Sequence, residues 1–164
     1  MSGHVPLAVL FDLDGTLIDT APEFVAIGLR LRQAAGLPAV APEAIRSRVS
    51  DGAIGMVAAA LEIETADPTF EQWRQRFLTD YEKGLGQHSE PYPGLRALVS
   101  ALGVSGIKWG VVTNKLSRFA HPLMEKMDFN PPADIVITPD DVSHPKPHPE
   151  SLILACKRLN CPPD

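Results

Sequence analysis

The chain has 164 residues, 45% of them hydrophobic, and a formal net charge of −5, so it is long enough for one domain, or for a modest core with an insertion. The negative charge and the lack of a basic cluster argue against nucleic-acid binding, and no segment reaches the roughly 18 apolar residues of a membrane span. Only Cys156 and Cys161 are present, too few for a disulfide framework. Since no signal-peptide pattern precedes them, we expect a cytoplasmic protein with reduced thiols.

The first predicted element is a buried strand at residues 7–10, and it leads directly into residues 11–17, Phe-Asp-Leu-Asp-Gly-Thr-Leu. Two carboxylates one residue apart at the end of a strand, followed by a glycine turn and a hydroxyl, are typical of a metal and phosphate site. Asp12 is a candidate nucleophile for covalent catalysis, and Asp14 is a candidate for moving protons.

Two other interpretations of this motif involve no phosphate chemistry. One is an ordinary Asp-Gly turn at the end of a strand, which is common in proteins. The other is a calcium loop, because Asp12, Asp14 and Glu23 occupy its first, third and twelfth positions. The calcium loop is excluded, since Leu17 stands at the sixth position, where such a loop needs glycine.

Residues 18–90 show helical patterns only, so we expect an all-helical block. Thr20 and Glu23 have the spacing of a capping box at the start of the first helix of this block. Gly36 is expected to end that helix. A helix that opens at Asp67 carries aromatic residues at helical spacing, and we expect this stripe to pack in a core. The stripe is Phe70, Trp73, Phe77 and Tyr81, and two further helices are predicted, one from Pro42 with Ile45 and Val49 on it and one from Ala53 to Glu62.

From Pro93 onward helices and strands alternate, which predicts parallel strands joined by right-handed crossovers. Ligands of such sheets gather at the carboxyl ends of the strands. The helical block then reads as an insertion after the first strand. The predicted elements are a helix with Leu95, Leu98, Val99 and Leu102 on one face, a strand at 109–113, a helix at 117–127, a strand at 135–138, and a helix from Pro149 that carries Leu152, Ile153, Cys156 and Leu159.

Three segments resemble signatures of the haloacid dehalogenase superfamily, most of whose members are phosphatases. They are Asp-Leu-Asp-Gly-Thr-Leu at 12–17, Val-Val-Thr-Asn-Lys at 111–115, and His-Pro-Lys-Pro-His-Pro at 144–149. The resemblance runs from about Leu7 to the end of the chain. It is closest to the phosphoglycolate-phosphatase-like subgroup, and residues 109–115 and 152–157 suggest its N-acetylmuramic acid 6-phosphate phosphatase branch.

The resemblance implies a magnesium-dependent phosphomonoesterase that forms an aspartyl-phosphate. In such an enzyme Asp12 is the nucleophile and Asp14 is the general acid and base. Thr113, Asn114 and Lys146 bind the substrate phosphate, and Mg²⁺ lies on the Asp12 carboxylate and the Asp14 backbone carbonyl. The implied substrate is a small phosphorylated metabolite, 2-phosphoglycolate or N-acetylmuramic acid 6-phosphate, which makes the protein a hydrolase of carbohydrate metabolism.

The same resemblance implies an α/β fold, with a Rossmann-like core from residues 1–17 and 91–164 and a helical cap from residues 18–90. Family members have a further strand that ends in Gly-Asp and a nearby acidic residue, which complete the metal site. This sequence stops at Asp164, on the approach to that strand. We therefore expect an open sheet edge beside the Asp12 strand, through which chains associate, and a weak enzyme. A fragment of a longer enzyme, a truncated gene product and an incompletely recorded chain all fit.

Other functions on this fold stay open, namely a sugar-phosphate mutase and a non-catalytic binding protein. A dehalogenase is disfavoured, because that branch lacks the second aspartate that Asp14 supplies. The phosphate-binding residues also have interpretations without a function. Thr113 could be an ordinary hydroxyl at a strand end, followed by a turn at Asn114 and Lys115, and Lys146 could be a solvated lysine in a loop.

Two further groups of polar residues have competing interpretations. His144 and His148 lie four apart, as metal ligands on a helix do, but the prolines between them exclude a helix and disfavour ligation. In the predicted cap, Arg46, Arg48 and Asp51 either reach the substrate or form a solvated helix face.

Overall fold

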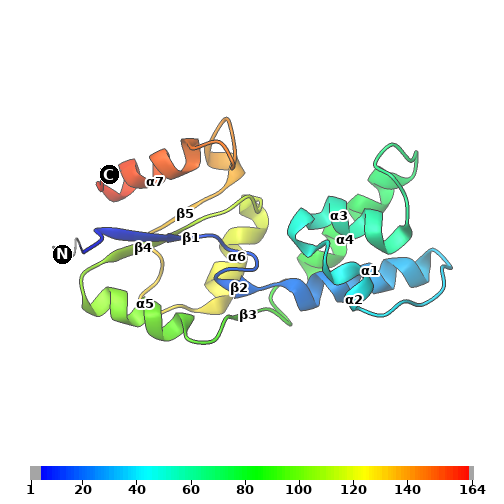
Figure 1. The fold of residues 1–164 in the computed structure, drawn as a ribbon, viewed down its shortest axis with the longest axis horizontal. Helices are drawn as coiled ribbons and strands as arrows, with labels where there is room; N and C mark the ends of the chain where they lie inside the picture. The colour runs from blue at the N-terminus through cyan, green and yellow to red at the C-terminus, as the bar shows by residue number, and fades with distance from the viewer. Residues whose placement is uncertain (1–4, 163–164) are drawn as a thin grey trace. The chain divides into compact units, whose positions relative to one another are not determined.

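The computed structural model describes residues 5–162. The chain divides into two compact units (Figure 1). The core unit comprises the residues up to Ile18 and those from Pro91 onward, and the helical unit comprises residues 19–90. Where the chain passes from one unit to the other, β2 (Ile18–Asp19) and β3 (Glu90–Pro91) form a two-stranded sheet.

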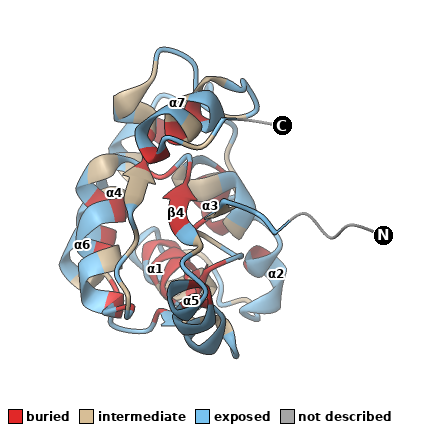
Figure 2. Cartoon of the chain, turned by 90° about the vertical axis from the view of Figure 1, so that its left-hand side faces the viewer, coloured by how far each residue is buried: buried red, intermediate tan, exposed pale blue. Residues whose placement is uncertain are grey.

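The core unit is built on a three-stranded parallel sheet with the order β1–β4–β5. Its central strand is β4, which is buried from its second residue onward (Figure 2), because it has a neighbour on both sides and helices on both faces. In the described chain β1 forms one edge of the sheet, as predicted for the Asp12 strand. The three strands are β1 (Ala8–Phe11), β4 (Lys108–Val112) and β5 (Ile135–Ile137).

Three helices complete the core unit: α5 (Leu95–Val104), α6 (Ser117–Met127) and α7 (Glu150–Leu159). Helix α7 lies on one face of the sheet, and α5 and α6 lie on the other (Figure 1). Alternating helices and parallel strands in this arrangement confirm the predicted α/β, Rossmann-like fold. A short 3₁₀ helix, η2 (Pro139–Asp141), follows β5.

The helices of the core unit bury narrower faces than predicted. Leu98 on α5 and Leu152 and Ile153 on α7 are exposed. On α7 the buried residues, Ser151, Ala155 and Leu159, stand four apart, so a single row of side chains is fully buried, and Leu154 packs partly buried beside it. A helix that meets a small sheet on one side buries such a row and leaves the flanking apolar side chains in solvent.

The helical unit is held by an aromatic core. The Phe24 ring packs edge-to-face on Phe77 and Tyr81, at centroid distances of 5.5 and 4.8 Å. Phe70, Phe77 and Tyr81 are buried, which confirms the predicted stripe, although Trp73 is half-buried. The elements are α1 (Ala21–Ala34), α2 (Glu43–Arg46), η1 (Val49–Asp51), α3 (Gly52–Leu61) and α4 (Phe70–Gly84).

Two local predictions for the helical unit are wrong. Among the described residues, the Thr20 side chain caps no backbone N–H of α1, and the Glu23 carboxylate instead accepts a hydrogen bond from the backbone N–H of His88 at 2.8 Å. The helix predicted from Pro42 through Val49 is split into α2 and η1. The N–H groups of Arg48 and Asp51 donate three residues back, which tightens the chain into 3₁₀ geometry.

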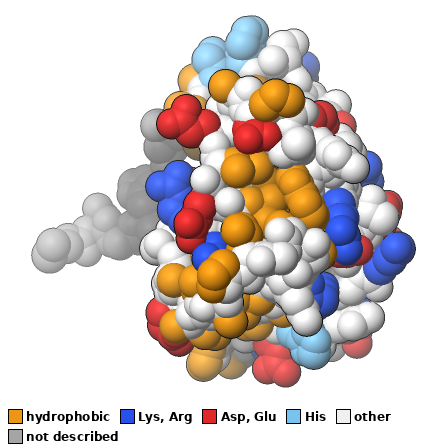
Figure 3. Space-filling view, turned by 90° about the vertical axis from the view of Figure 1, so that its right-hand side faces the viewer, with side chains coloured by type: hydrophobic (Ala, Val, Ile, Leu, Met, Phe, Trp, Pro, Cys, Tyr) orange, Lys and Arg blue, Asp and Glu red, His pale blue; other side chains and the backbone are white. Residues whose placement is uncertain are grey.

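The surface mixes apolar and charged side chains. One face shows a central group of hydrophobic side chains with acidic and basic ones around it (Figure 3). Within the helical unit a pocket of about 490 Å³ lies among α1, α2 and α3, lined by Arg32, Ile45, Arg48 and Ala59 among others. Across residues 5–162, no helix has both the length and the apolar character needed to cross a membrane.

Candidate functional site

The loop after β1 presents two carboxylates from a rigid turn. Leu13 and Ile18 are fully buried and anchor the loop, and the Leu13 carbonyl accepts a hydrogen bond from the Ile18 N–H at 3.0 Å. Gly15 adopts φ +75°, a left-handed conformation that favours glycine, and it donates to the Ile18 carbonyl at 2.9 Å. This turn leaves Asp12 and Asp14 accessible at the carboxyl end of the strand, with side chains 46% and 31% exposed.

Lys146 joins the Asp12 carboxylate to the neighbouring strand. Its Nζ lies 2.8 Å from Asp12 Oδ1 and donates to the backbone carbonyl of Val112 at 2.7 Å. Asp12 Oδ1 also accepts the N–H of Leu13 at 2.8 Å. The Asn114 amide donates to the Lys146 carbonyl at 2.9 Å. Three of the residues singled out in the sequence thus lie together, although they are far apart in the chain.

A second lysine, which sequence reasoning missed, pairs with Asp14. Lys115 Nζ lies 2.8 Å from Asp14 Oδ1, and the Lys115 side chain is only 5% exposed. The Lys115 backbone N–H donates to Thr113 Oγ1 at 3.0 Å. The turn at Asn114 and Lys115 is therefore more than a solvated connection. The available signal was a lysine just beyond a buried strand, at the same sheet edge as the two aspartates.

The site balances its own charges. Two carboxylates at the end of β1 face two ammonium groups, one from the end of β4 and one from the loop before α7. Opposite charges this close stabilise one another more strongly in a partly buried site than in water. Thr113 is buried beside them, with its hydroxyl at the end of β4. Carboxylates, cations and a hydroxyl gathered at one sheet edge are groups that can bind and stabilise an oxyanion.

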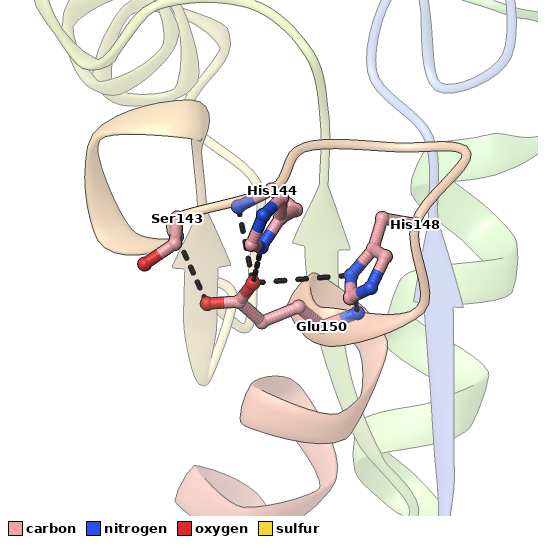
Figure 4. Close-up of polar contacts among 4 residues, drawn as sticks. All are labelled: Ser143, His144, His148 and Glu150. Atoms are coloured by element: carbon pink, nitrogen blue, oxygen red, sulfur yellow. Dashed lines mark hydrogen bonds and ion pairs between the residues drawn. The ribbon is translucent and has the colours of Figure 1, made fainter.

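The loop that carries Lys146 is fastened to the first residue of α7 (Figure 4). The Glu150 carboxylate accepts the backbone N–H groups of Ser143 and His144 at 2.9 and 3.0 Å. It also lies 3.0 Å from Nδ1 of His144 and 3.8 Å from Nδ1 of His148. The hydrogen bond from Ser143, and then those from His144, hold the pKa of Glu150 below its ordinary value.

This fastening also brings together the two histidines that sequence reasoning had disfavoured as ligands. Although the loop is not helical, ligand atoms of His144, His148 and Glu150 lie within 4.8 Å of one another. The hydrogen bonds that Glu150 makes to the loop account for this arrangement. We therefore describe the group as a loop clamp.

The predicted cap residues form ion pairs inside the helical unit. Arg48 Nε lies 2.9 Å from Asp51, and Arg46 lies 3.7 Å from Asp19. All four side chains are partly exposed. They remain candidates for substrate contact, since pairs of this kind hold their partners weakly.

Comparison with known proteins gives matches along almost the whole chain. Residues 9–164 match the family model of haloacid dehalogenase-like hydrolases. An N-acetylmuramic acid 6-phosphate phosphatase of Pseudomonas aeruginosa is 46% identical over 156 residues, which cover 95% of this chain and 69% of that protein. A phosphoglycolate phosphatase of Xanthomonas campestris is 34% identical over 154 residues, covering 94% and 69%.

A solved structure shares the fold. The crystal structure of a predicted phosphoglycolate phosphatase from Haemophilus somnus superposes with a TM-score of 0.81 at 22% identity, covering 97% of this chain and 74% of that one. At that identity the likeness shows the fold alone. Together with the family match and the 46% identical relative, it leads to one conclusion: the chain belongs to the haloacid dehalogenase-like hydrolases.

Proposed function

We propose that this protein is a magnesium-dependent phosphomonoesterase that works through an aspartyl-phosphate. Two ion pairs at one edge of the sheet carry the proposal. Asp12 pairs with Lys146 and Asp14 pairs with Lys115, each at a distance of 2.8 Å between nitrogen and oxygen. A nucleophilic carboxylate, a second carboxylate for protons and cations for the phosphate are the groups that such a reaction requires.

In the proposed reaction the residues have separate tasks. Asp12 attacks phosphorus while Asp14 gives its proton to the leaving alkoxide, and in the second step Asp14 takes a proton from the attacking water. Thr113 Oγ1 accepts the Lys115 N–H, and in this proposal the hydroxyl donates its own hydrogen to a phosphoryl oxygen. Asn114 and Lys146 provide the remaining phosphate contacts.

The oxygen donors among the described residues fit part of a magnesium site, which the resemblance implies a further strand completes. Both contacts described for the Asp12 carboxylate fall on Oδ1, which leaves Oδ2 as an oxygen ligand, and Asp14 offers its backbone carbonyl. These are the hard oxygen donors that Mg²⁺ prefers in phosphoryl-transfer sites. Bound there, the ion would offset the repulsion between a carboxylate nucleophile and a phosphate dianion.

For the substrate we propose a small organic phosphate, with N-acetylmuramic acid 6-phosphate ahead of 2-phosphoglycolate. The support is the higher identity to the relative that bears the first name, 46% against 34%. We further propose that the helical unit acts as a cap that selects the substrate, because it is inserted in the chain between the two catalytic strands.

Phosphate release tests this proposal. The purified protein is assayed with both esters in the presence of Mg²⁺ and again after EDTA, with Asp12→Asn as the matched variant. We expect slow hydrolysis, in line with the weak enzyme predicted from the sequence, that EDTA abolishes and fresh Mg²⁺ restores. Asp12→Asn keeps the shape of the side chain but removes the attacking charge, so turnover should fall by several orders of magnitude. Hydrolysis by Asp12→Asn near the wild-type rate would exclude the mechanism.

The same assay separates the alternatives. A mutase converts a sugar phosphate to its isomer without releasing inorganic phosphate, which product analysis detects. A binding protein keeps its affinity for magnesium and a phosphate mimic in calorimetry but turns nothing over. Either result would replace the phosphatase proposal.

A further inference from the structure

We infer that Lys115 is a positioning residue for the proton transfers made by Asp14. Its ammonium holds Asp14 through Oδ1 and stabilises the carboxylate that forms when the proton leaves. The inference rests on the function proposed above and deepens it. The Asp14–Lys115 pair, with its 2.8 Å contact, is the observation behind it.

The burial of Lys115 sets this pair apart from a surface ion pair. Lysine is almost never fully buried unless it is paired, because removing an ammonium from water is costly. Here the Lys115 side chain is 5% exposed, whereas Asp14 is 31% exposed. A long side chain held in this way has little freedom, so the position of its charge is well defined.

The backbone of Lys115 is held close to the end of strand β4. Lys115 follows β4 by three residues, and its backbone N–H is bonded to Thr113 Oγ1. Strand β4 is parallel to β1 and in register with it, with Val111 opposite Phe11. The two partners therefore extend from neighbouring strand ends, and the sheet itself sets the distance between them.

The first half-reaction is the one that benefits from this cation. In the first, the bond between phosphorus and the leaving oxygen breaks as the bond from Asp12 forms. The Asp14 proton passes to the leaving alkoxide, and a negative charge appears on Asp14. In the second, that carboxylate takes a proton from the water that attacks phosphorus, which releases inorganic phosphate and restores Asp12. An ammonium 2.8 Å from Oδ1 stabilises the charge where it develops.

The division of labour between the two lysines follows from their partners. Lys146 touches the Asp12 carboxylate and, in the proposed function, the phosphate. Lys115 touches the Asp14 carboxylate. Loss of Lys115 should therefore slow proton transfer while substrate binding is retained, and loss of Lys146 should affect binding as well.

Leaving-group dependence tests this inference. Lys115→Met keeps the length of the side chain and removes the charge. With N-acetylmuramic acid 6-phosphate, whose alkoxide must be protonated, we expect kcat to fall by about 10- to 100-fold with KM unchanged. With 4-nitrophenyl phosphate, whose leaving group needs little protonation, we expect a loss of about threefold or less. A purely structural role would reduce both rates by the same factor.

Lys108→Met is the matched control. Lys108 begins the same strand, and its Nζ donates to the Leu159 carbonyl at 2.6 Å, away from the carboxylates. Its loss should change the two rates equally or not at all. As a second measurement, Lys115→Ala is assayed with ethylammonium, which should restore the rate with the alkyl ester and leave the aryl ester unaffected. This measurement also serves if Lys115→Met fails to fold by circular dichroism.

The possible results of these assays distinguish failure of the role inferred for Lys115 from failure of the proposed phosphatase function. Equal losses with the two esters, or no rescue by ethylammonium, would overturn the role of Lys115 and leave the phosphatase intact. A wild-type protein that hydrolyses neither ester would overturn the proposed function, and this inference with it.

Discussion

The ammonium of Lys146 lies 2.8 Å from Asp12 Oδ1 and is also bonded to the Val112 carbonyl, so one side chain links the ends of β1 and β4. The lysine comes from a loop that is distant in the chain from both strands. The nucleophile that we propose is therefore held in place by the same group that would meet the phosphate.

Lys146→Met should lower kcat/KM for phosphate esters by roughly 10²- to 10³-fold. The variant removes the charge that holds Asp12 and that would stabilise the phosphoryl oxygens. Steady-state phosphate release measures the change, and Lys157→Met on the exposed side of α7 serves as control. An unchanged kcat/KM would show that Lys146 is a solvated loop lysine.

The loop clamp should contribute stability in a pH-dependent way. Hydrogen bonds from Ser143 and His144 lower the pKa of Glu150 in the folded protein below its ordinary 4.5. The stabilisation from these hydrogen bonds is therefore complete when the pH lies above the ordinary pKa. It is lost as the pH falls through the lower pKa that Glu150 has in the folded protein. We expect Glu150→Gln to lower the urea midpoint at about pH 5 but hardly at all at about pH 2.

Both pH values lie on the acid side because His144 and His148 face the same carboxylate. Carbon-13 NMR of the Glu150 carboxyl gives its titration directly. A midpoint at or above the ordinary value would contradict the clamp.

Gly110→Ala should destabilise the core unit by about 1–3 kcal/mol. A Cβ there would lie 2.5 Å from Ile135 Cγ1 and 2.9 Å from the Ile135 carbonyl oxygen, so β4 and β5 would have to move apart. Gly84→Ala is the control, because it meets nothing within 4 Å. It should be neutral or stabilise by about 0.4–1 kcal/mol. Urea denaturation compares them, and equal stability of the two variants would refute the packing argument.

Substrate preference should depend on the segment at residues 46–52. Replacing Arg46 and Arg48 by alanine should reduce kcat/KM for N-acetylmuramic acid 6-phosphate about tenfold more than for 2-phosphoglycolate, since the larger ester extends farther from its phosphate. Arg76→Ala, which removes a guanidinium packed over the Trp73 ring on α4, is the control. An unchanged ratio would remove this segment from substrate selection.

Patterns within a few residues predicted much of this fold. Helix α6 begins and ends at the predicted residues, and β4 differs from the predicted strand by a single residue at each end. Two of the misses depend on partners distant in the chain. Glu23 accepts a hydrogen bond from His88, 65 residues away, in place of the expected capping-box contact. The Asp14–Lys115 ion pair joins residues 101 positions apart.

Exposed apolar residues were missed for a related reason. Leu152 and Ile153 fit a helical stripe, but α7 packs on β4 and β5 with these two side chains exposed. The width of a partner surface is a tertiary property that helical periodicity does not contain. The candidate site was predictable to the extent that strand ends converge, and Lys146 was predicted with it. The pairing of Lys115 with Asp14 is a tertiary contact that the sequence pattern does not contain.

The clamp at Glu150 has a further consequence for the energetics of turnover. Because Ser143 and His144 are already bonded to its carboxylate, the loop loses its conformational entropy when the protein folds. A substrate then meets a lysine whose arrangement is settled in advance, and binding need not bear the cost of ordering it.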